Sequence, residues 1–267
     1  MIPFLQGKSA KLFVILAGIF VTTALVAEFI GVKIFSLEAS MGFQPADLSF
    51  FGVKHLSFNL TAGVLLWPVV FVMTDIINEY YGPKGVNFLS WMTAGLISFA
   101  FIITFIAIRL DPAGFWPQSH VAPNLTPSQQ QDILTKVGDY NYAFQLVFGQ
   151  GLWIIIGSLV AFLLGQVVDV VSFHRIKQLT GEKYIWLRST GSTLISQLID
   201  SFVVLFIAFY IGANWSLSQV FAIGLMNYIY KFIMAVGLTP IIYWMHGAIE
   251  RYLGHDEAER LRGLAMS

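Results

Sequence analysis

Residues 74–82, TDIINEYYG, place acidic and amide side chains within an apolar stretch that covers residues 60–81. Asp75, Asn78 and Glu79 are three and four residues apart, so in a helix they share one face. About 20 mostly apolar residues suffice to cross a bilayer as a helix. Ionisable groups in hydrocarbon cost roughly 2.5–3.5 kcal/mol each on insertion scales. The stretch therefore predicts a membrane helix whose polar face has a function.

The composition of the whole chain also indicates a membrane protein. Of its 267 residues, 57% are hydrophobic and 11% are charged, with a mean hydropathy of +0.73. Soluble domains carry about 25% charged residues. These values exclude a soluble enzyme, a nucleic-acid-binding protein and a disordered scaffold. The absence of cysteine excludes a disulfide framework and a thiolate metal site.

Six segments are long and apolar enough to cross a membrane as helices. They cover residues 11–35, 60–81, 86–108, 142–171, 186–211 and 217–244. The first is longer than the apolar core of a cleavable signal, about 7–15 residues, so we expect it to be retained. The predicted fold class is an all-α integral membrane protein, a single six-span transmembrane domain over residues 1–267.

Lys and Arg residues are distributed unequally over the two sides of this predicted membrane domain. One side, which includes both termini, carries Lys8, Lys11, Lys84, Arg175, Lys177, Lys183, Arg188, Arg251, Arg260 and Arg262. The other side carries Lys33, Lys54, Arg109 and Lys136. Basic residues favour the cytoplasmic side. We therefore expect both termini in the cytoplasm, with a charged helical tail at 247–267 and periplasmic loops at 36–59 and 110–141.

The two predicted loops are long enough to contain structure of their own. Residues 36–59 hold four phenylalanines among polar residues and are expected to form a cap or a re-entrant segment. In the second loop, Thr126, Pro127 and Gln129 have the types and spacing of an N-cap, an N1 proline and an N3 partner. They predict a short helix that ends near Gly138.

The two halves of the chain share a weak internal repeat. Residues 74–79, TDIINE, align with residues 196–201, SQLIDS, and Ala27-Glu28 aligns with Gly165-Gln166. Three spans in each half would place the halves in opposite orientations across the membrane. The pattern predicts two inverted three-helix repeats, with a substrate at their interface near the membrane centre.

Polar side chains also occur in the other predicted spans. Besides the first stretch, they include Glu28, Gln166, Asp169, Thr193, Gln197, Asp200, Ser201, Asn227 and Lys231. We expect them to line a cavity, and one amine among several carboxylates leaves a surplus of acidic groups. Such a surplus suits a cationic ligand or one rich in N–H donors, and the acidic groups could also carry protons. The alternative is structural: Glu79 and Asp169 face water near the cytoplasm, and Lys231 is a counter-ion for Asp75 or Asp200.

No pattern in the chain indicates an enzyme, a metal site or a cofactor. The sequence has no HExxH, GxSxG or Walker motif. All five histidines are predicted to lie outside the hydrocarbon. Gly157, Ala161 and Gly165 form a stripe of small residues that permits close helix approach. Internal packing is the favoured role of this stripe, and a homodimer face is the alternative.

Four segments resemble the YhhQ family, the queuosine precursor transporters, also called the vitamin uptake transporter family. They are TDIINEYYG at 74–82, AEFIGVK at 27–33, VD at 168–169 and SQLIDS at 196–201. The resemblance covers all six spans, although the loop at 110–141 is longer than it leads us to expect. It implies import of 7-cyano-7-deazaguanine and 7-aminomethyl-7-deazaguanine across the bacterial inner membrane.

This implied substrate matches the surplus of acidic groups. A carboxylate can accept N1–H and the 2-amino group of a deazaguanine together, its O6 needs a donor, and its flat ring suits an aromatic face. The predicted substrate-binding residues are Asp75, Asn78, Glu79, Gln197 and Asp200, followed by Glu28, Asn227 and Lys231. We predict a secondary transporter or facilitator whose partners are the base and membrane lipid. The alternatives are a substrate-binding membrane subunit of an ATP-driven uptake system, and a scaffold that transports nothing.

Overall fold

The computed structural model describes residues 7–181 and 184–265, so Lys183 of the predicted basic set lies outside the described residues. The chain divides into two compact units. The first unit contains Met1–Leu96 and Leu152–Ser267, and the second contains the residues between them, 97–151. All of the predicted substrate-binding residues belong to the first unit.

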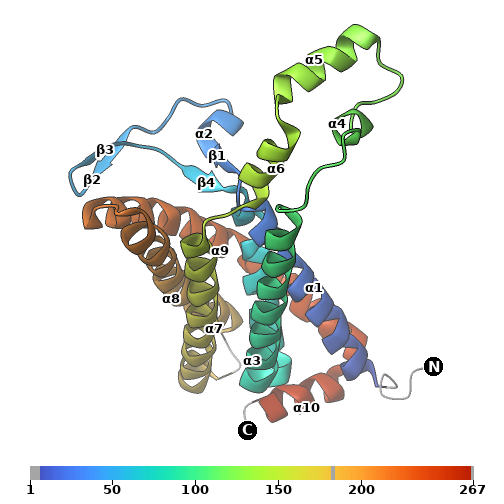
Figure 1. Ribbon diagram of the computed structural model, residues 1–267. Helices are drawn as coiled ribbons and strands as arrows, with labels where there is room; N and C mark the ends of the chain where they lie inside the picture. Colours follow the sequence, from blue (N-terminus) through green and yellow to red (C-terminus); the bar gives the residue numbers. More distant parts are fainter. Residues whose placement is uncertain (1–6, 182–183, 266–267) are drawn as a thin grey trace. The chain divides into compact units, whose positions relative to one another are not determined.

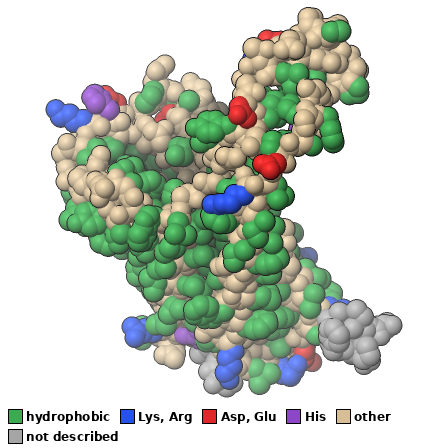
Figure 2. All heavy atoms as spheres, in the orientation of Figure 1, with side chains coloured by type: hydrophobic (Ala, Val, Ile, Leu, Met, Phe, Trp, Pro, Cys, Tyr) green, Lys and Arg blue, Asp and Glu red, His purple; other side chains and the backbone are tan. Residues whose placement is uncertain are grey.

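Long helices dominate the chain (Figure 1). Within the described residues, five helical segments are long and apolar enough to cross a membrane, which confirms a helical, multi-pass membrane protein. Hydrophobic side chains cover the sides of the long helices in the lower part of Figure 2, where Lys and Arg gather at the helix ends. The main helices are α1 (Lys8–Ile30), α3 (Trp67–Ala107), α7 (Leu152–Thr180), α8 (Ile185–Leu205) and α9 (Leu217–Leu253).

The second long helix, α3, contains two of the predicted spans. Gly82 has non-helical dihedral angles, φ 67° and ψ −173°, and separates the helix into two parts. The Tyr81 hydroxyl donates to the carbonyl of Ser9 at 2.7 Å, so this break lies beside the beginning of α1. The six predicted segments are thus five long helices, one of them broken, and the inverted repeat stays a prediction.

Short strands and helices replace the ends of the first two predicted spans. The first span stops at Ile30 rather than residue 35, and the second begins at Trp67 rather than residue 60. The segment between them contains β1 (Ile34–Ser36), α2 (Leu37–Ser40), β2 (Leu48–Phe50), β3 (Val53–Leu56), β4 (Asn59–Thr61) and the 3-10 helix η2 (Ala62–Leu65). Strand β1 pairs antiparallel with β4, and β2 pairs antiparallel with β3.

Glu38 organises this segment. Its Oε1 accepts the backbone N–H groups of Phe58 at 2.8 Å and Ala46 at 3.4 Å. Burial alone would raise the pKa of Glu38, but the hydrogen bonds from Phe58, Ala46 and Ser36 outweigh it and hold the pKa below its usual value. The carboxylate is therefore ionised at neutral pH and fastens the segment at three points.

The second unit confirms the predicted capped helix. Helix α5 (Pro127–Val137) begins at N-cap Thr126, which forms a capping box with Gln129, and ends at Gly138. Two further short helices, α4 (Trp116–Ser119) and α6 (Tyr140–Phe148), lie in this unit. The helix boundary at residues 149–151 means that α7 starts ten residues later than the predicted fourth span.

Helices α7 and α8 pack closely through the stripe of small residues. A Cβ atom on Gly157 would lie 3.2 Å from the carbonyl oxygen of Val204, and one on Gly165 would lie 3.7 Å from Cβ of Asp200. Ala161 is also buried, at 1% exposure. The stripe is therefore used for internal packing, as favoured from the sequence. After α8 the chain continues as a π-helix, η3 (Phe206–Ile211).

The C-terminal segment is two helices rather than one tail. Helix α9 continues to Leu253, and α10 (His255–Ala265) follows Gly254, whose φ is 90°. The Lys8 amine lies 5.7 Å from the centre of the Tyr252 ring, so α1 begins where α9 ends. The side of the membrane on which these two ends lie remains a prediction.

The break at Gly82 should tolerate no side chain. A Cβ atom there would lie 2.8 Å from the carbonyl oxygen of Ala265 in α10, and its φ of 67° with ψ of −173° falls in a region essentially restricted to glycine, which costs other residues about 1–3 kcal/mol. We expect Gly82→Ala to lower the melting temperature in detergent and to increase proteolysis of α10. Gly18→Ala is the matched control, because a Cβ at Gly18 meets nothing within 4 Å. Equal melting temperatures for the two variants would contradict this role of Gly82.

Candidate functional site

A polar seam joins the first half of α3 to α7. Thr74 donates to Gln166 Oε1 at 3.1 Å, and Asn78 Oδ1 lies 2.9 Å from Nε2 of His174. Residues 74 and 78 are one turn apart on α3, and Gln166 and His174 are about two turns apart on α7, so the two contacts follow each other along the helix pair. Asn78 is thus placed between α3 and α7, and His174 lies in a long helix rather than in a loop.

Glu79 is at one end of the seam and is fully buried. Its carboxylate accepts Arg188 Nη2 at 2.7 Å and Nε at 3.1 Å, and Lys177 Nζ lies 3.1 Å away. Arg188 and Lys177 are 1% and 2% exposed. Glu79 therefore does not face water, which removes that part of the structural alternative. The prediction that Arg188 and Lys177 lie in a loop is wrong, because both are buried and lie in helices. The structure pairs them because an unpaired buried charge would be costly.

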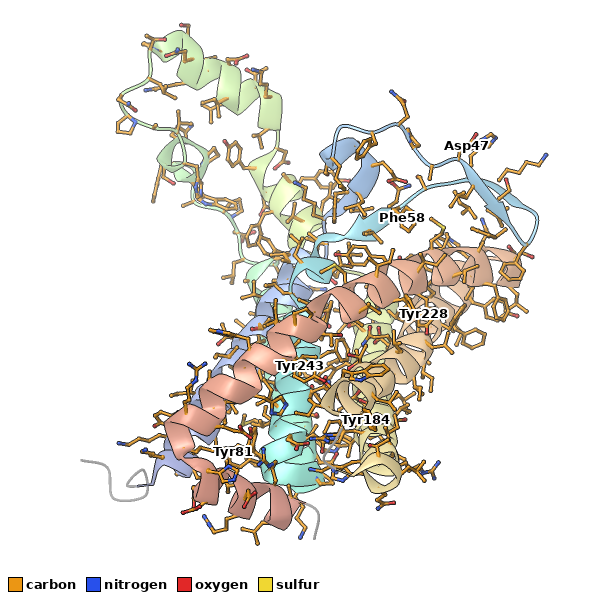
Figure 3. The ribbon with its side chains drawn as sticks, turned by 180° about the vertical axis from the view of Figure 1, so that it is seen from behind. Asp47, Phe58, Tyr81, Tyr184, Tyr228 and Tyr243 are labelled. Carbon is orange, nitrogen blue, oxygen red and sulfur yellow. The ribbon has the colours of Figure 1, made fainter. Side chains whose placement is uncertain are left out.

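A cavity lies between η2, α3, α8 and α9. Its space totals about 480 Å³, a figure that includes the part open to solvent. Figure 3 shows α9 in front of α3 and α8, with Tyr228 and Tyr243 along it. The lining residues are Val64, Trp67, Pro68, Phe71, Val72, Asp75, Thr190, Thr193, Gln197, Tyr230, Lys231, Met234, Ala235, Leu238 and Ile242.

Two polar atoms of residues that line this cavity have no partner among the residues that the structure describes. Asp75 and Gln197 are each 2% exposed. Asp75 Oδ2 accepts the hydroxyls of Ser189 and, at 3.4 Å, Thr193, whereas Oδ1 accepts nothing from the described residues. Gln197 Nε2 likewise has no acceptor among them. Buried polar atoms without partners are rare and call for an explanation, and a ligand would supply one.

Lys231 is the third of the predicted substrate-binding residues that line the cavity. It is already paired with another predicted substrate-binding residue. Its ammonium forms an ion pair with Asp200, and both side chains are less than one-fifth exposed. Lys231 is therefore the counter-ion of Asp200 and not of Asp75, one of the two structural alternatives. Glu28, whose polar neighbours include Ser158 and Asp200, and half-buried Asn227 are not among the described residues that line the cavity.

Sequence reasoning missed several cavity residues and one structural cluster. Phe71 and Thr190 line the cavity without having been selected, while Trp67 and Tyr230 were noted only as nearby aromatics. A signal existed for Phe71, which lies one helical turn before Asp75 and so on the same face. Arg188 also lay inside the predicted fifth span, and that position alone should have marked it as buried.

The ion pair of Glu79 with Arg188 should be a stability determinant. Arg188→Ala leaves a buried carboxylate with Lys177 as its remaining basic partner, a change that costs about 3–5 kcal/mol where a buried pair is broken. We expect a large fall in melting temperature and a smaller one when Glu79, Arg188 and Lys177 are all replaced by Gln, since no member of the charged cluster is then left without its partner. Arg175→Ala, on the exposed face of α7, is the control. If the Arg188 and Arg175 variants unfold alike, the pair has no such role.

Comparison with known proteins supplies independent evidence. Residues 61–245 match the family model described as "Putative vitamin uptake transporter". The chain is 28% identical over 209 residues to a probable queuosine precursor transporter of Bacillus subtilis, covering 77% of this chain and 78% of the relative. It is 25% identical over 188 residues to the queuosine precursor transporter of Escherichia coli, covering 69% and 71%.

A probable queuosine precursor transporter of Haemophilus influenzae is 26% identical over 194 residues, covering 71% of this chain and 69% of the relative. No solved structure matches the chain. All three relatives are described as transporters rather than enzymes. The family match spans more than half of the chain and contains Asp75, Gln197 and every other residue that lines the cavity. The chain therefore belongs to the vitamin uptake transporter family.

Proposed function

We propose that this protein transports queuosine precursors, 7-deazaguanine bases, and that the cavity at Asp75 and Gln197 binds them. The observation that carries the proposal is the pair of unpartnered atoms, one acceptor and one donor, on residues that line one cavity. The names of the three relatives support the substrate class. The same proposal includes import of these bases across a bacterial inner membrane.

The hydrogen-bonding edge of a deazaguanine complements these two residues. Its N1–H and 2-amino group are adjacent donors, and its O6 is an acceptor on the same edge. An ionised carboxylate is acceptor-only with about four lone-pair sites, so Asp75 can bind a ligand while Oδ2 keeps its hydroxyl donors. Gln197 Nε2 can donate to O6. A base without the guanine pattern would leave one of these buried atoms unpaired, which costs about 1–3 kcal/mol.

The rest of the cavity suits a flat, mostly apolar ring. Trp67 and Phe71 have ring centroids 6.4 Å apart and lie on one side, while Tyr230 comes from α9 on the other. Aromatic faces stack on planar ligands, and methyl and methylene groups of Val72, Ala235 and Leu238 exclude water. Because the Lys231 ammonium already pairs with Asp200, we assign it no direct role in reading the base.

Asp75→Asn should abolish most binding. The substitution removes a hydrogen bond to a charged group, worth about 1.5–3 kcal/mol, which corresponds to a roughly 10- to 150-fold weaker Kd. Gln197→Leu removes a neutral donor and should have a smaller effect. The measurement is equilibrium binding of labelled 7-cyano-7-deazaguanine to purified protein, with uptake into proteoliposomes as a second readout.

Asp256→Asn serves as the matched control, because Asp256 is exposed on α10. Wild-type binding by the Asp75→Asn variant would refute the assignment of this cavity. Uptake into proteoliposomes that contain only this chain separates two mechanisms. Uptake there supports a transporter that works alone, whereas binding without uptake supports a subunit of an ATP-driven system.

A further inference from the structure

A second carboxylate, Asp169 of α7, lies beside Asp75 and plays no part in the function proposed above. Asp169 is 0% exposed and does not line the cavity. The negative charges of the two carboxylates repel each other. Among the described residues, neither carboxylate forms an ion pair with Lys, Arg or His. Two buried, adjacent carboxylates without a cation cannot both stay ionised at low cost.

The hydroxyls around Asp169 cannot satisfy it as an anion. Ser196 donates to Asp169 Oδ1 at 3.2 Å but shares that hydrogen with the carbonyl of Thr193 at 3.0 Å. Ser192 donates to the carbonyl of Ser189 at 3.0 Å. Thr193, which also faces Asp169, directs its hydroxyl hydrogen to Asp75. Asp169 Oδ2 is left without a donor among the described residues.

We propose that Asp169 and Asp75 share one proton and that Asp169 is a positioning residue for the base. With the proton on Asp169, that carboxyl is neutral, and Thr193 keeps its hydroxyl hydrogen directed to Asp75. The proton removes the repulsion between the two buried carboxylates, while Ser196 still donates to Asp169 Oδ1. Asp75 is then the ionised member and presents Oδ1 to the ligand. This inference rests on the proposed function, because it assigns Asp75 to the base.

Other charged groups near the pair are already engaged. Glu79 acts on Asp75 electrostatically, but Arg188 and Lys177 bind its carboxylate. His174, one turn beyond Asp169 on α7, contacts Asn78. On the cavity side, Lys231 pairs with Asp200. The hydroxyls of α8 and the Asp75 carboxylate of α3 are thus the groups that face Asp169, and they leave the shared proton as its counter-charge.

The proton predicts a pH profile with two limbs. When the medium becomes acidic, Asp75 is protonated too and loses the ability to accept two N–H donors. When it becomes alkaline, the shared proton is lost, and the repulsion between two buried anions disrupts the site. Binding of 7-cyano-7-deazaguanine, which carries no titratable amine, should therefore fall on both sides of neutral pH.

The Asp169→Asn variant separates this proposal from a structural role. Its side chain is neutral like the protonated acid and keeps an oxygen for the Ser196 hydroxyl, so binding at neutral pH should stay near wild type and the alkaline limb should disappear. Asp169→Leu offers Ser196 no acceptor and should bind about tenfold more weakly, the equivalent of about 1.4 kcal/mol. The His174→Gln control should keep both limbs. An alkaline limb that persists in Asp169→Asn, its absence from wild type, or a requirement for Na⁺ instead of a proton would overturn the proposal.

Infrared spectroscopy tests the proton without any ligand. We expect the carboxylic-acid C=O band of wild-type protein at neutral pH to lose intensity in Asp169→Asn, because the substitution removes the carboxyl group that holds the proton. An unchanged band would overturn the shared proton even if the base binds. Conversely, wild-type protein that binds no base at any pH but shows the band change would refute the proposed function and support the proton site.

Discussion

Charged side chains within hydrocarbon need partners, and the ion pair of Glu79 with Arg188 supplies them where α3, α7 and α8 meet. Lys177 adds a second cation from α7, so one carboxylate ties the three helices together. The cost of leaving any of these charges unpaired fixes how the helices pack. The seam of Thr74, Gln166, Asn78 and His174 follows from this register, and it places the next residue of α3, Asp75, against α8.

The same helix face thus has two kinds of polar residue. Glu79 is fully paired and holds the structure, whereas Asp75 keeps an unpartnered oxygen and lines the cavity. The surplus of acidic groups expected from the sequence is smaller than it first appeared, because Arg188 and Lys177 are also buried. What remains of it is concentrated at Asp75 and Asp169. A ligand rich in N–H donors would supply the partner that Asp75 lacks, and a proton would supply the counter-charge that Asp169 lacks.

Local signals in the sequence were sufficient where neighbouring residues determine the structure. Thr126 and Gln129 predicted a capping box, which is present. Asp75, Asn78 and Glu79 were predicted to lie in one helix, and all three are buried in α3. Partners distant in the chain could not be inferred, because they depend on tertiary packing. Arg188 was assigned to a loop because its partner Glu79 lies 109 positions away in the chain, so nothing in the sequence indicated the ion pair. The break at Gly82 and the strands at residues 34–36 and 59–61 likewise depend on contacts with other elements.

We propose that Asp75 binds the donor edge of a deazaguanine. An experimental structure of the protein with bound 7-cyano-7-deazaguanine tests this role most directly. We expect N1 and the 2-amino nitrogen at hydrogen-bond distance, about 2.7–3.2 Å, from the Asp75 carboxylate, with the ring beside Trp67 and Tyr230. A base bound in the α3–α7 seam, at Glu28, or with its O6 toward Asp75 would contradict it.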